Sequence, residues 1–193
     1  MQEDQAELLK IITSFLGKSK ILYMITGAWS VIYYGRPRAS HDIDFVVELK
    51  KEDTSKILKA IDSLPEEFSA QKGAIKEAIK KRGMFNIFHL PTALKMDFWL
   101  LTDDEFDKSR FSRRKKVKIL GQEMEIATAE DTTLQKLRWY QEAKIEKHLI
   151  DAAFVYQIQN KNLDKSYLKK WAKKLKIEKH YRALGKIDLE KYM

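Results

Sequence analysis

Three aspartates stand out among the 193 residues because their type and spacing fit metal-dependent chemistry. Asp42 and Asp44 lie two apart in the run 41–47, HDIDFVV, which is rich in strand-forming β-branched and aromatic residues. Side chains two apart on a strand share a face, so the two carboxylates point the same way while Ile43 and Phe45 point to the other face. Two carboxylates this close repel each other unless one is protonated or a cation lies between them.

Asp97 is the third aspartate, and it lies inside the apolar run 94–101. A buried charge needs a partner, and a metal ion would supply one. Oxygen-only ligands suit Mg²⁺, which binds through one or two carboxylates and the phosphates of a substrate. We therefore predict a magnesium site formed by Asp42, Asp44 and Asp97. The alternative is that the first two form a solvated pair at the entrance of a strand.

A glycine turn precedes the strand that carries Asp42 and Asp44. The run 21–26 favours a strand, Gly27 ends it, and the apolar residues 28–34 favour a helix. A glycine at such a junction lets a ligand approach the backbone closely, and the N–H groups at the start of a helix attract an anion such as phosphate. Ser30 would add a hydroxyl to the same site. The alternative is that Gly27 only makes the turn.

These residues together resemble the nucleotidyltransferase superfamily typified by DNA polymerase β. The resemblance covers roughly residues 20–101 and, more loosely, the helices after 130. It is carried by Gly27, Gly35, the pattern Arg38-x-Ser40-x-Asp42-x-Asp44, and Asp97. Among the branches of the superfamily, the pattern is similar to AbiE-type toxin nucleotidyltransferases and to aminoglycoside or lincosamide nucleotidyltransferases.

The resemblance implies a Mg²⁺-dependent enzyme that moves a nucleoside monophosphate from an NTP, such as ATP, to an acceptor hydroxyl and releases pyrophosphate. Asp42 and Asp44 would hold Mg²⁺, and Asp97 would complete a second metal site and help deprotonate the acceptor. The acceptor is an RNA, a protein or a small molecule.

The resemblance also implies further nucleotide-binding positions. Lys136 and Asp151 stand where small toxin-like relatives bind the triphosphate, and the alternative for each is an ordinary solvated or ion-paired helix residue. Arg38 is a candidate phosphate contact because its planar guanidinium matches phosphate oxygens, although it could instead pair with a carboxylate and brace the loop. The predicted nucleotide-binding residues are Gly27, Ser30, Arg38, Ser40, Lys136 and Asp151.

Two other classes of function remain open. The family usually has Gly-Gly or Gly-Ser where this chain has Gly27-Ala28, so the chain could be an inactive nucleotide- or RNA-binding module with the same fold. Asp44 followed by Glu48-x-Lys50 resembles the acid-x-Lys arrangement of metal-dependent nucleases. That second interpretation leaves Gly27 and Asp97 without a role.

The elements that position these residues follow from the pattern of apolar side chains. We expect an α/β fold with a mixed sheet and flanking helices, divided into a nucleotidyltransferase-like core, 1–128, and a C-terminal helical segment, 129–193. Predicted helices are 5–16, 28–34, 52–64, one starting at Thr128, and 145–158, and residues 163–184 are a last basic amphipathic stretch. Hairpins are predicted for 84–101 and 115–126. Residues 66–83 are predicted to form a mobile connection with some helix, and residues 102–111 a loop.

Composition limits the classes of protein further. The chain has no cysteine, which excludes disulfides, iron–sulfur clusters and cysteine nucleophiles. No apolar run approaches the length of a membrane span, and the acidic start lacks a signal-peptide pattern, so we expect a cytoplasmic protein that does not bind membranes. Within the net charge of +9, basic residues gather in 108–118 and 161–191, which suggests attraction of an NTP or RNA. The alternative is a solvated surface.

Overall fold

The computed structural model describes residues 2–192, with the side chains of residues 2–4 left aside, and divides into two compact units. Unit 1 contains Met1–Ala28 and Ala39–Ile126, and unit 2 contains Trp29–Arg38 and Ala127–Met193. The boundary therefore falls inside helix α2, Gly27–Tyr34. Residues 29–38 group with the C-terminal helices in this division, and the predicted domains 1–128 and 129–193 stay a prediction.

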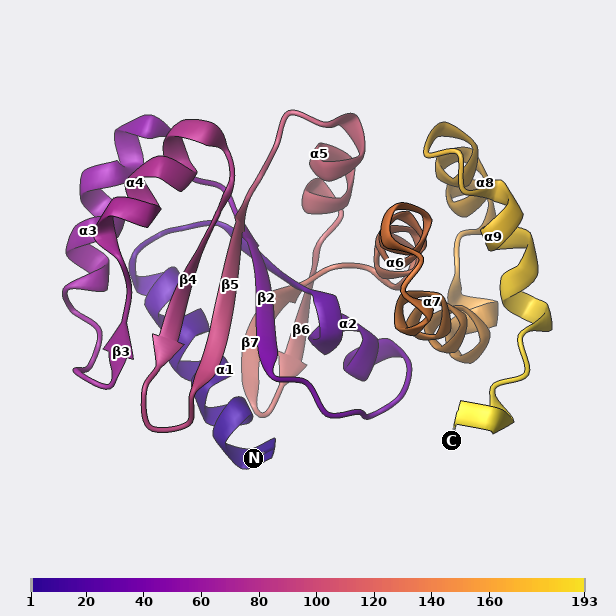
Figure 1. Cartoon of the computed structure of the whole chain (residues 1–193), viewed down its shortest axis with the longest axis horizontal. Coiled ribbons are helices and arrows are strands. Elements are labelled where there is room, and N and C mark those ends of the chain that lie inside the picture. The colour runs from indigo at the N-terminus through magenta and orange to yellow at the C-terminus, as the bar shows by residue number, and fades with distance from the viewer. Residues whose placement is uncertain (1, 193) are drawn as a thin grey trace. The chain divides into compact units, whose positions relative to one another are not determined.

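A seven-stranded mixed sheet forms the centre of unit 1, and its strand order is β3-β4-β5-β2-β1-β7-β6 (Figure 1). The strand pairs β2 with β5 and β1 with β7 are parallel, while the other neighbours are antiparallel. This architecture confirms the expected α/β fold and both predicted hairpins. The strands are β1 Tyr23–Thr26, β2 Asp42–Val47, β3 Phe68–Ser69, β4 Met84–His89, β5 Leu94–Leu100, β6 Lys115–Ile119 and β7 Gln122–Ile126.

The central strands have one apolar face that forms the core of unit 1. Ile43 and Phe45 of β2 are fully buried, which agrees with their predicted orientation away from the aspartates. Phe98 of β5 lies between two aromatic neighbours, stacked on Phe45 with ring centroids 5.1 Å apart and on Phe85 of β4 at 5.0 Å. The same alternation that buries these rings leaves the polar residues of β2 and β5 on the opposite face of the sheet.

Four further helices belong to unit 1, and two of them differ from expectation. The helices are α1 Gln2–Lys18, α3 Thr54–Ile61, α4 Lys72–Lys81 and α5 Glu105–Ser112. Figure 1 shows α3 and α4 together at the β3–β4 end of the sheet. The segment 66–83 holds the short strand β3 and the ten-residue helix α4, where we expected a mobile connection with some helix.

The predicted loop 102–111 was wrong, because helix α5 begins there. The carboxylate of Asp104 accepts hydrogen bonds from the backbone N–H groups of Phe106 and Asp107, both 3.0 Å long, and so caps the helix. Phe106 and Phe111 are buried, which anchors one side of an otherwise charged segment. Tertiary burial of two rings therefore stabilises a helix that its local pattern does not predict.

Unit 2 is helical apart from its turns. Its helices are α6 Ala129–Ala143, α7 Glu146–Gln159, α8 Lys165–Lys174 and α9 Glu178–Ala183. Thr128 caps α6 as predicted, since its side chain accepts from the N–H of Asp131. The basic amphipathic stretch 163–184 forms two helices, because Lys176 adopts a left-handed backbone conformation with φ of 57° and Ile177 turns into the core.

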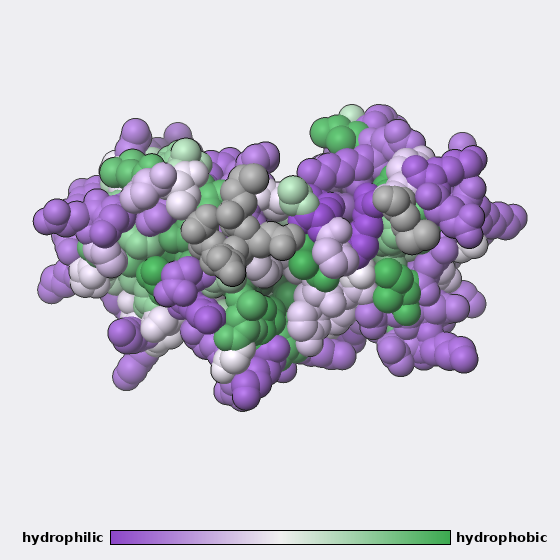
Figure 2. Space-filling view, turned by 90° about the horizontal axis from the view of Figure 1, so that it is seen from below, coloured by the Kyte–Doolittle hydropathy of each residue, from purple (hydrophilic) through white to green (hydrophobic). Residues whose placement is uncertain are grey.

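Hydrophilic side chains cover much of the face shown in Figure 2, with small hydrophobic groups between them. Across residues 2–192, the helices are too short or too polar to span a bilayer.

We expect Phe98→Ala to destabilise the protein by about 3–5 kcal/mol, because it removes the central ring of a fully buried stack. Urea unfolding measures the loss. Trp99→Ala is the matched control, since Trp99 is the next residue on β5 but is 42% exposed. Equal losses in the two variants would contradict the assignment of Phe98 to the core.

Candidate functional site

The polar face of the central sheet brings the three predicted aspartates onto neighbouring strands of unit 1. In the parallel pairing of β2 with β5, Asp44 lies opposite Asp97, and Asp42 lies opposite Lys95. Because residues two apart on a strand share a face, these four side chains form a two-by-two arrangement on one side of the sheet. We call it the acidic face.

Lys95 is the residue of the acidic face that the sequence analysis missed. Its Nζ lies 3.0 Å from Oδ2 of Asp97 and 3.7 Å from Oδ1 of Asp42. The hydrogen bond to Asp97 raises the pKa of Lys95 against the opposing effect of burial, so the side chain is an ammonium at neutral pH. Its spacing of two from Asp97 was a signal in the sequence that could have placed it on the same face.

Asp97 is buried, as its apolar surroundings predicted, but it has partners within the protein. Besides the ion pair with Lys95, it accepts a hydrogen bond from the side-chain amide of Asn86, which lies opposite it on β4. Protein donors thus reach both carboxylate oxygens of Asp97. The burial of this carboxylate therefore does not by itself require a metal ion.

Gly27 lies directly against Asp44. Its φ of +62° belongs to the left-handed region, and a Cβ built on it would lie 1.9 Å from Oδ2 of Asp44. A side chain at this position would collide with the carboxylate, so the close approach requires glycine. The turn that begins α2 therefore also determines the space that the Asp44 carboxylate occupies.

The donors of the acidic face suit a hard divalent cation, since Asp42, Asp44 and Asp97 offer only carboxylate oxygens. Their side chains do not converge on one point: among the residues that the structure describes, no three His, Cys, Asp or Glu side chains are grouped to hold a metal. The strand register explains why the predicted three-aspartate site is not assembled, because Lys95 occupies the fourth position of the two-by-two arrangement. The carboxylate oxygens are suitable ligands for Mg²⁺. One of the three carboxylates, Asp97, is however paired with Lys95.

The other predicted charged residues form a buried cluster within unit 2. Arg38 binds Asp151 of α7 through two hydrogen bonds, Nε to Oδ1 at 3.0 Å and Nη2 to Oδ2 at 2.9 Å. Lys136 of α6 also contacts Oδ2 of Asp151 at 2.9 Å. Asp151 is 1% exposed and Lys136 is 4% exposed. Two cations and one carboxylate therefore share a site from which water is almost excluded.

Burial and charge oppose each other at Asp151. Burial is the largest single influence and raises the pKa of its carboxyl, but the combined charges and hydrogen bonds of Lys136 and Arg38 hold the pKa below its usual value. Lys136 also lies over the ring of Trp139, 5.2 Å from its centroid, and the ring of His148 is 5.4 Å from that of Trp139. The pKa of His148 is lowered by burial and by the charge of Lys136.

The two serines of the predicted nucleotide site have different surroundings. Ser30 is fully buried in α2. The hydroxyl of Ser40 lies 3.1 Å from the carbonyl oxygen of Asp42 and 3.5 Å from its nitrogen, so Ser40 braces the start of β2. The predicted contacts of Ser30, Ser40 and Arg38 with a phosphate stay predictions.

Part of the basic segment 108–118 is paired within unit 1. Lys108 contacts Asp103, Arg110 contacts Asp107, and Arg114 contacts Glu125. Besides Lys108, the exposed lysines of the segment are Lys115, Lys116 and Lys118 on β6, an edge strand. Lysines on an edge strand also discourage pairing with another chain, so they do not require a nucleic-acid partner.

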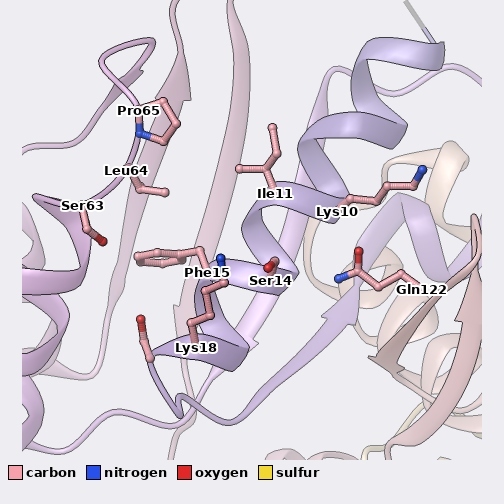
Figure 3. Close-up of a pocket in the computed structure, with 10 residues that line it drawn as sticks. Lys10, Ile11, Ser14, Phe15, Lys18, Ser63, Leu64, Pro65 and Gln122 are labelled. Carbon is pink, nitrogen blue, oxygen red and sulfur yellow. The ribbon is translucent and has the colours of Figure 1, made fainter.

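A cavity of about 660 Å³ lies elsewhere in unit 1, between α1 and residues 63–65. Its apolar lining includes Ile11 and Phe15 on α1 and Leu64 across from them, as Figure 3 shows. None of the predicted site residues lines it. Its size alone therefore does not make it a catalytic site.

Comparisons with known proteins agree with the resemblance noted in the sequence. A family model described as "Nucleotidyl transferase AbiEii toxin, Type IV TA system" matches residues 27–192. No curated protein matches the chain in sequence.

Several solved structures share the fold. The antibiotic-resistance factor ANT(2'')-Ia superposes with a TM-score of 0.60 at 14% identity, over 95% of this chain and 96% of that one. An antigenic nucleotidyltransferase-like protein from Paracoccidioides brasiliensis gives 0.56 at 16%, over 92% and 89%. The lincosamide antibiotic adenylyltransferase LnuA gives 0.51 at 12%, over 78% and 95%. At these identities the likeness is one of fold.

We expect Gly27→Ala to destabilise the protein by at least about 1–2 kcal/mol, because alanine is strained at positive φ and its Cβ would displace the Asp44 carboxylate. Gly17→Ala is the control. A Cβ at Gly17, inside α1, meets nothing within 4 Å, so this variant should be as stable as the wild type or more stable. Urea unfolding compares the two, and a neutral Gly27→Ala would refute the close approach.

We expect Asp151→Asn to cost about 3–5 kcal/mol at pH 7, because it removes the buried carboxylate that contacts both Arg38 and Lys136. Lys136→Met should cost less, since Arg38 still binds both oxygens of Asp151. The lowered pKa of Asp151 stabilises the fold fully above the unfolded value of about 3.9, and this contribution is lost as pH falls through the folded pKa. The stability gap between wild type and Asp151→Asn should therefore narrow below about pH 4. A gap that widens on acidification would contradict the ionised state of Asp151.

Proposed function

Because this chain belongs to the AbiEii nucleotidyl transferase family, we propose that it uses a divalent metal ion to move a nucleoside monophosphate from an NTP to an acceptor hydroxyl. The enzyme class follows from the family. The observation that carries the metal assignment is the acidic face, where Asp42, Asp44 and Asp97 lie on neighbouring strands of one sheet face. Gly27 at the adjacent turn lies against Asp44.

The proposed reaction is a single displacement at the α-phosphorus of the NTP. The acceptor oxygen forms a bond to this phosphorus, and the bond from the phosphorus to the oxygen that bridges to the β-phosphate breaks. Pyrophosphate leaves with that oxygen. The proton of the acceptor hydroxyl passes to Asp97, and no oxidant or further reactant is needed.

Asp42 and Asp44 are the proposed ligands of the metal, with Mg²⁺ as the ion that such oxygen donors prefer. When bound, the metal neutralises negative charge on the triphosphate. The protein itself contributes little covalent chemistry to such a reaction, so the rate depends on how firmly its residues hold their positions. Firm positioning is consistent with the close approach of Asp44 to Gly27 and with the hydrogen bond that Asn86 donates to Asp97.

Lys136 and Arg38 remain the proposed phosphate contacts of unit 2. Both side chains are basic and lie at a site from which water is almost excluded, where electrostatic attraction is stronger than it is in water. This argument for a phosphate contact uses only residues of unit 2.

The acceptor is proposed as a class, a molecule with a free hydroxyl. Two of the similar structures are described as a lincosamide antibiotic adenylyltransferase bound to lincomycin and as ANT(2'')-Ia in complex with an adenylylated tobramycin. An RNA acceptor would be favoured by the exposed lysines of β6 in segment 108–118 and by the eleven basic residues of segment 161–191. RNA, protein and small molecules are therefore each tested as acceptors.

We expect Asp42→Asn and Asp44→Asn each to reduce transfer by at least about a thousandfold, because each removes a proposed metal ligand with little change in volume. Transfer is measured with each α-labelled NTP and Mg²⁺. Asp62→Asn is the control, because Asp62 is an exposed aspartate of unit 1 that pairs only with the exposed Lys72 among the contacts described. Near-normal turnover in either acidic-face variant, with the melting temperature unchanged, would contradict the assignment of Asp42 and Asp44 as metal ligands.

Mass spectrometry of pooled RNA, of the protein itself and of small hydroxylated compounds after incubation identifies the acceptor by the added nucleotide mass. An RNA acceptor should bind less tightly as salt rises, since each neutralised phosphate releases counterions. Binding of NTP without transfer to any acceptor would favour the inactive binding module. Cleavage of nucleic acid without transfer would favour the nuclease.

A further inference from the structure

The acidic face contains its own cation, the ammonium of Lys95, which lies where a metal ion would bind. In the register of β2 and β5, one row pairs Asp44 with Asp97 and the next row pairs Asp42 with Lys95. Three carboxylates and one ammonium thus occupy four neighbouring positions of one face. The repulsion among the carboxylates is reduced by a protein side chain before any metal binds.

The two contacts of Lys95 are unequal. Its 3.0 Å contact is with Asp97, whose side chain is only 9% exposed, whereas its 3.7 Å contact is with Asp42, whose side chain is 47% exposed. A contact with an exposed carboxylate is weakened by water, while one with a buried carboxylate is screened much less. Lys95 is therefore bound mainly to Asp97.

The carboxylate of Asp97 is occupied on both sides. Oδ2 faces the Lys95 ammonium, and Oδ1 accepts from the amide of Asn86. A divalent cation that approached Asp97 would meet a positive charge 3.0 Å from the oxygen it needs. Like charges repel strongly where water is scarce, so both cations cannot hold this oxygen together.

We propose that Lys95 is a positioning residue that acts as the resident counter-ion of Asp97 and Asp42 and competes with a divalent metal for the acidic face. The proposal rests on the proposed function only in taking Asp42, Asp44 and Asp97 as metal ligands. Without metal, Lys95 stabilises the folded acidic face. Metal binds Asp97 only after the Lys95 side chain, 34% exposed and flexible, has moved away from it.

The test measures metal binding in the absence of nucleotide. The full chain is titrated with Mn²⁺ alone, and the free ion is followed by its electron paramagnetic resonance signal. Lys95→Met should bind Mn²⁺ about tenfold more tightly than the wild type, because the competing ammonium is gone. Lys95→Arg, which keeps the charge, should stay within about threefold of the wild type.

Thermal unfolding gives a second readout on the same samples. Without metal, Lys95→Met should melt below the wild type, since Asp97 and Asp42 have lost the ammonium that contacts them. Mn²⁺ should raise its melting temperature more than that of the wild type. Lys76→Met is the control, because Lys76 is an exposed lysine on α4 of the same unit. It should match the wild type in both measurements. If Lys95→Met fails to fold, Lys95→Gln removes the charge and keeps a polar end.

Equal or weaker Mn²⁺ binding by Lys95→Met and Lys95→Gln would overturn the proposal and leave Lys95 a structural ion-pair partner. If neither the wild type nor any variant binds Mn²⁺ at millimolar concentrations of the ion, the proposal is also overturned. Either result is separable from failure of the proposed function, because the transfer assay with Asp42→Asn and Asp44→Asn is read independently.

Discussion

The charge balance of the acidic face is the constraint on which the rest of unit 1 depends. Three carboxylates on two adjacent strands repel one another, and the sheet tolerates them because Lys95 contacts two of them and Gly27 leaves room for the third. The apolar face of the same strands holds the stacked rings of Phe45, Phe85 and Phe98. Packing of that core sets the strand register, and the register in turn decides which charges become neighbours.

The charged cluster of unit 2 presents the reverse balance. Asp151 is a single carboxylate between Arg38 and Lys136, and all three belong to a site with little access to water. Removing water strengthens both the attraction within the cluster and the penalty for losing any member. The acidic face contains three carboxylates and one ammonium, whereas this cluster contains two basic side chains and one carboxylate. Each is a property of its own unit.

Local sequence predicted the parts of the structure that depend on neighbouring residues. Alternation in 41–47 predicted the strand and the shared face of Asp42 and Asp44, because side-chain direction in a strand repeats every two residues. Thr128 predicted a helix start, because capping needs only a side chain and the next turn. Helix α5 was missed for the opposite reason: half of its residues are charged, and what stabilises it is the burial of Phe106 and Phe111 in the folded structure.

The chemistry available to this protein can be seen in its residues: three aspartates with strand spacing, a glycine turn and no cysteine. Which charges come into contact depends on the fold. The parallel pairing of β2 with β5 puts Lys95 opposite Asp42, and the fold of unit 2 brings Arg38 to Asp151 across 113 residues of chain. No local pattern encodes these contacts, because they depend on how apolar faces far apart in the sequence pack together.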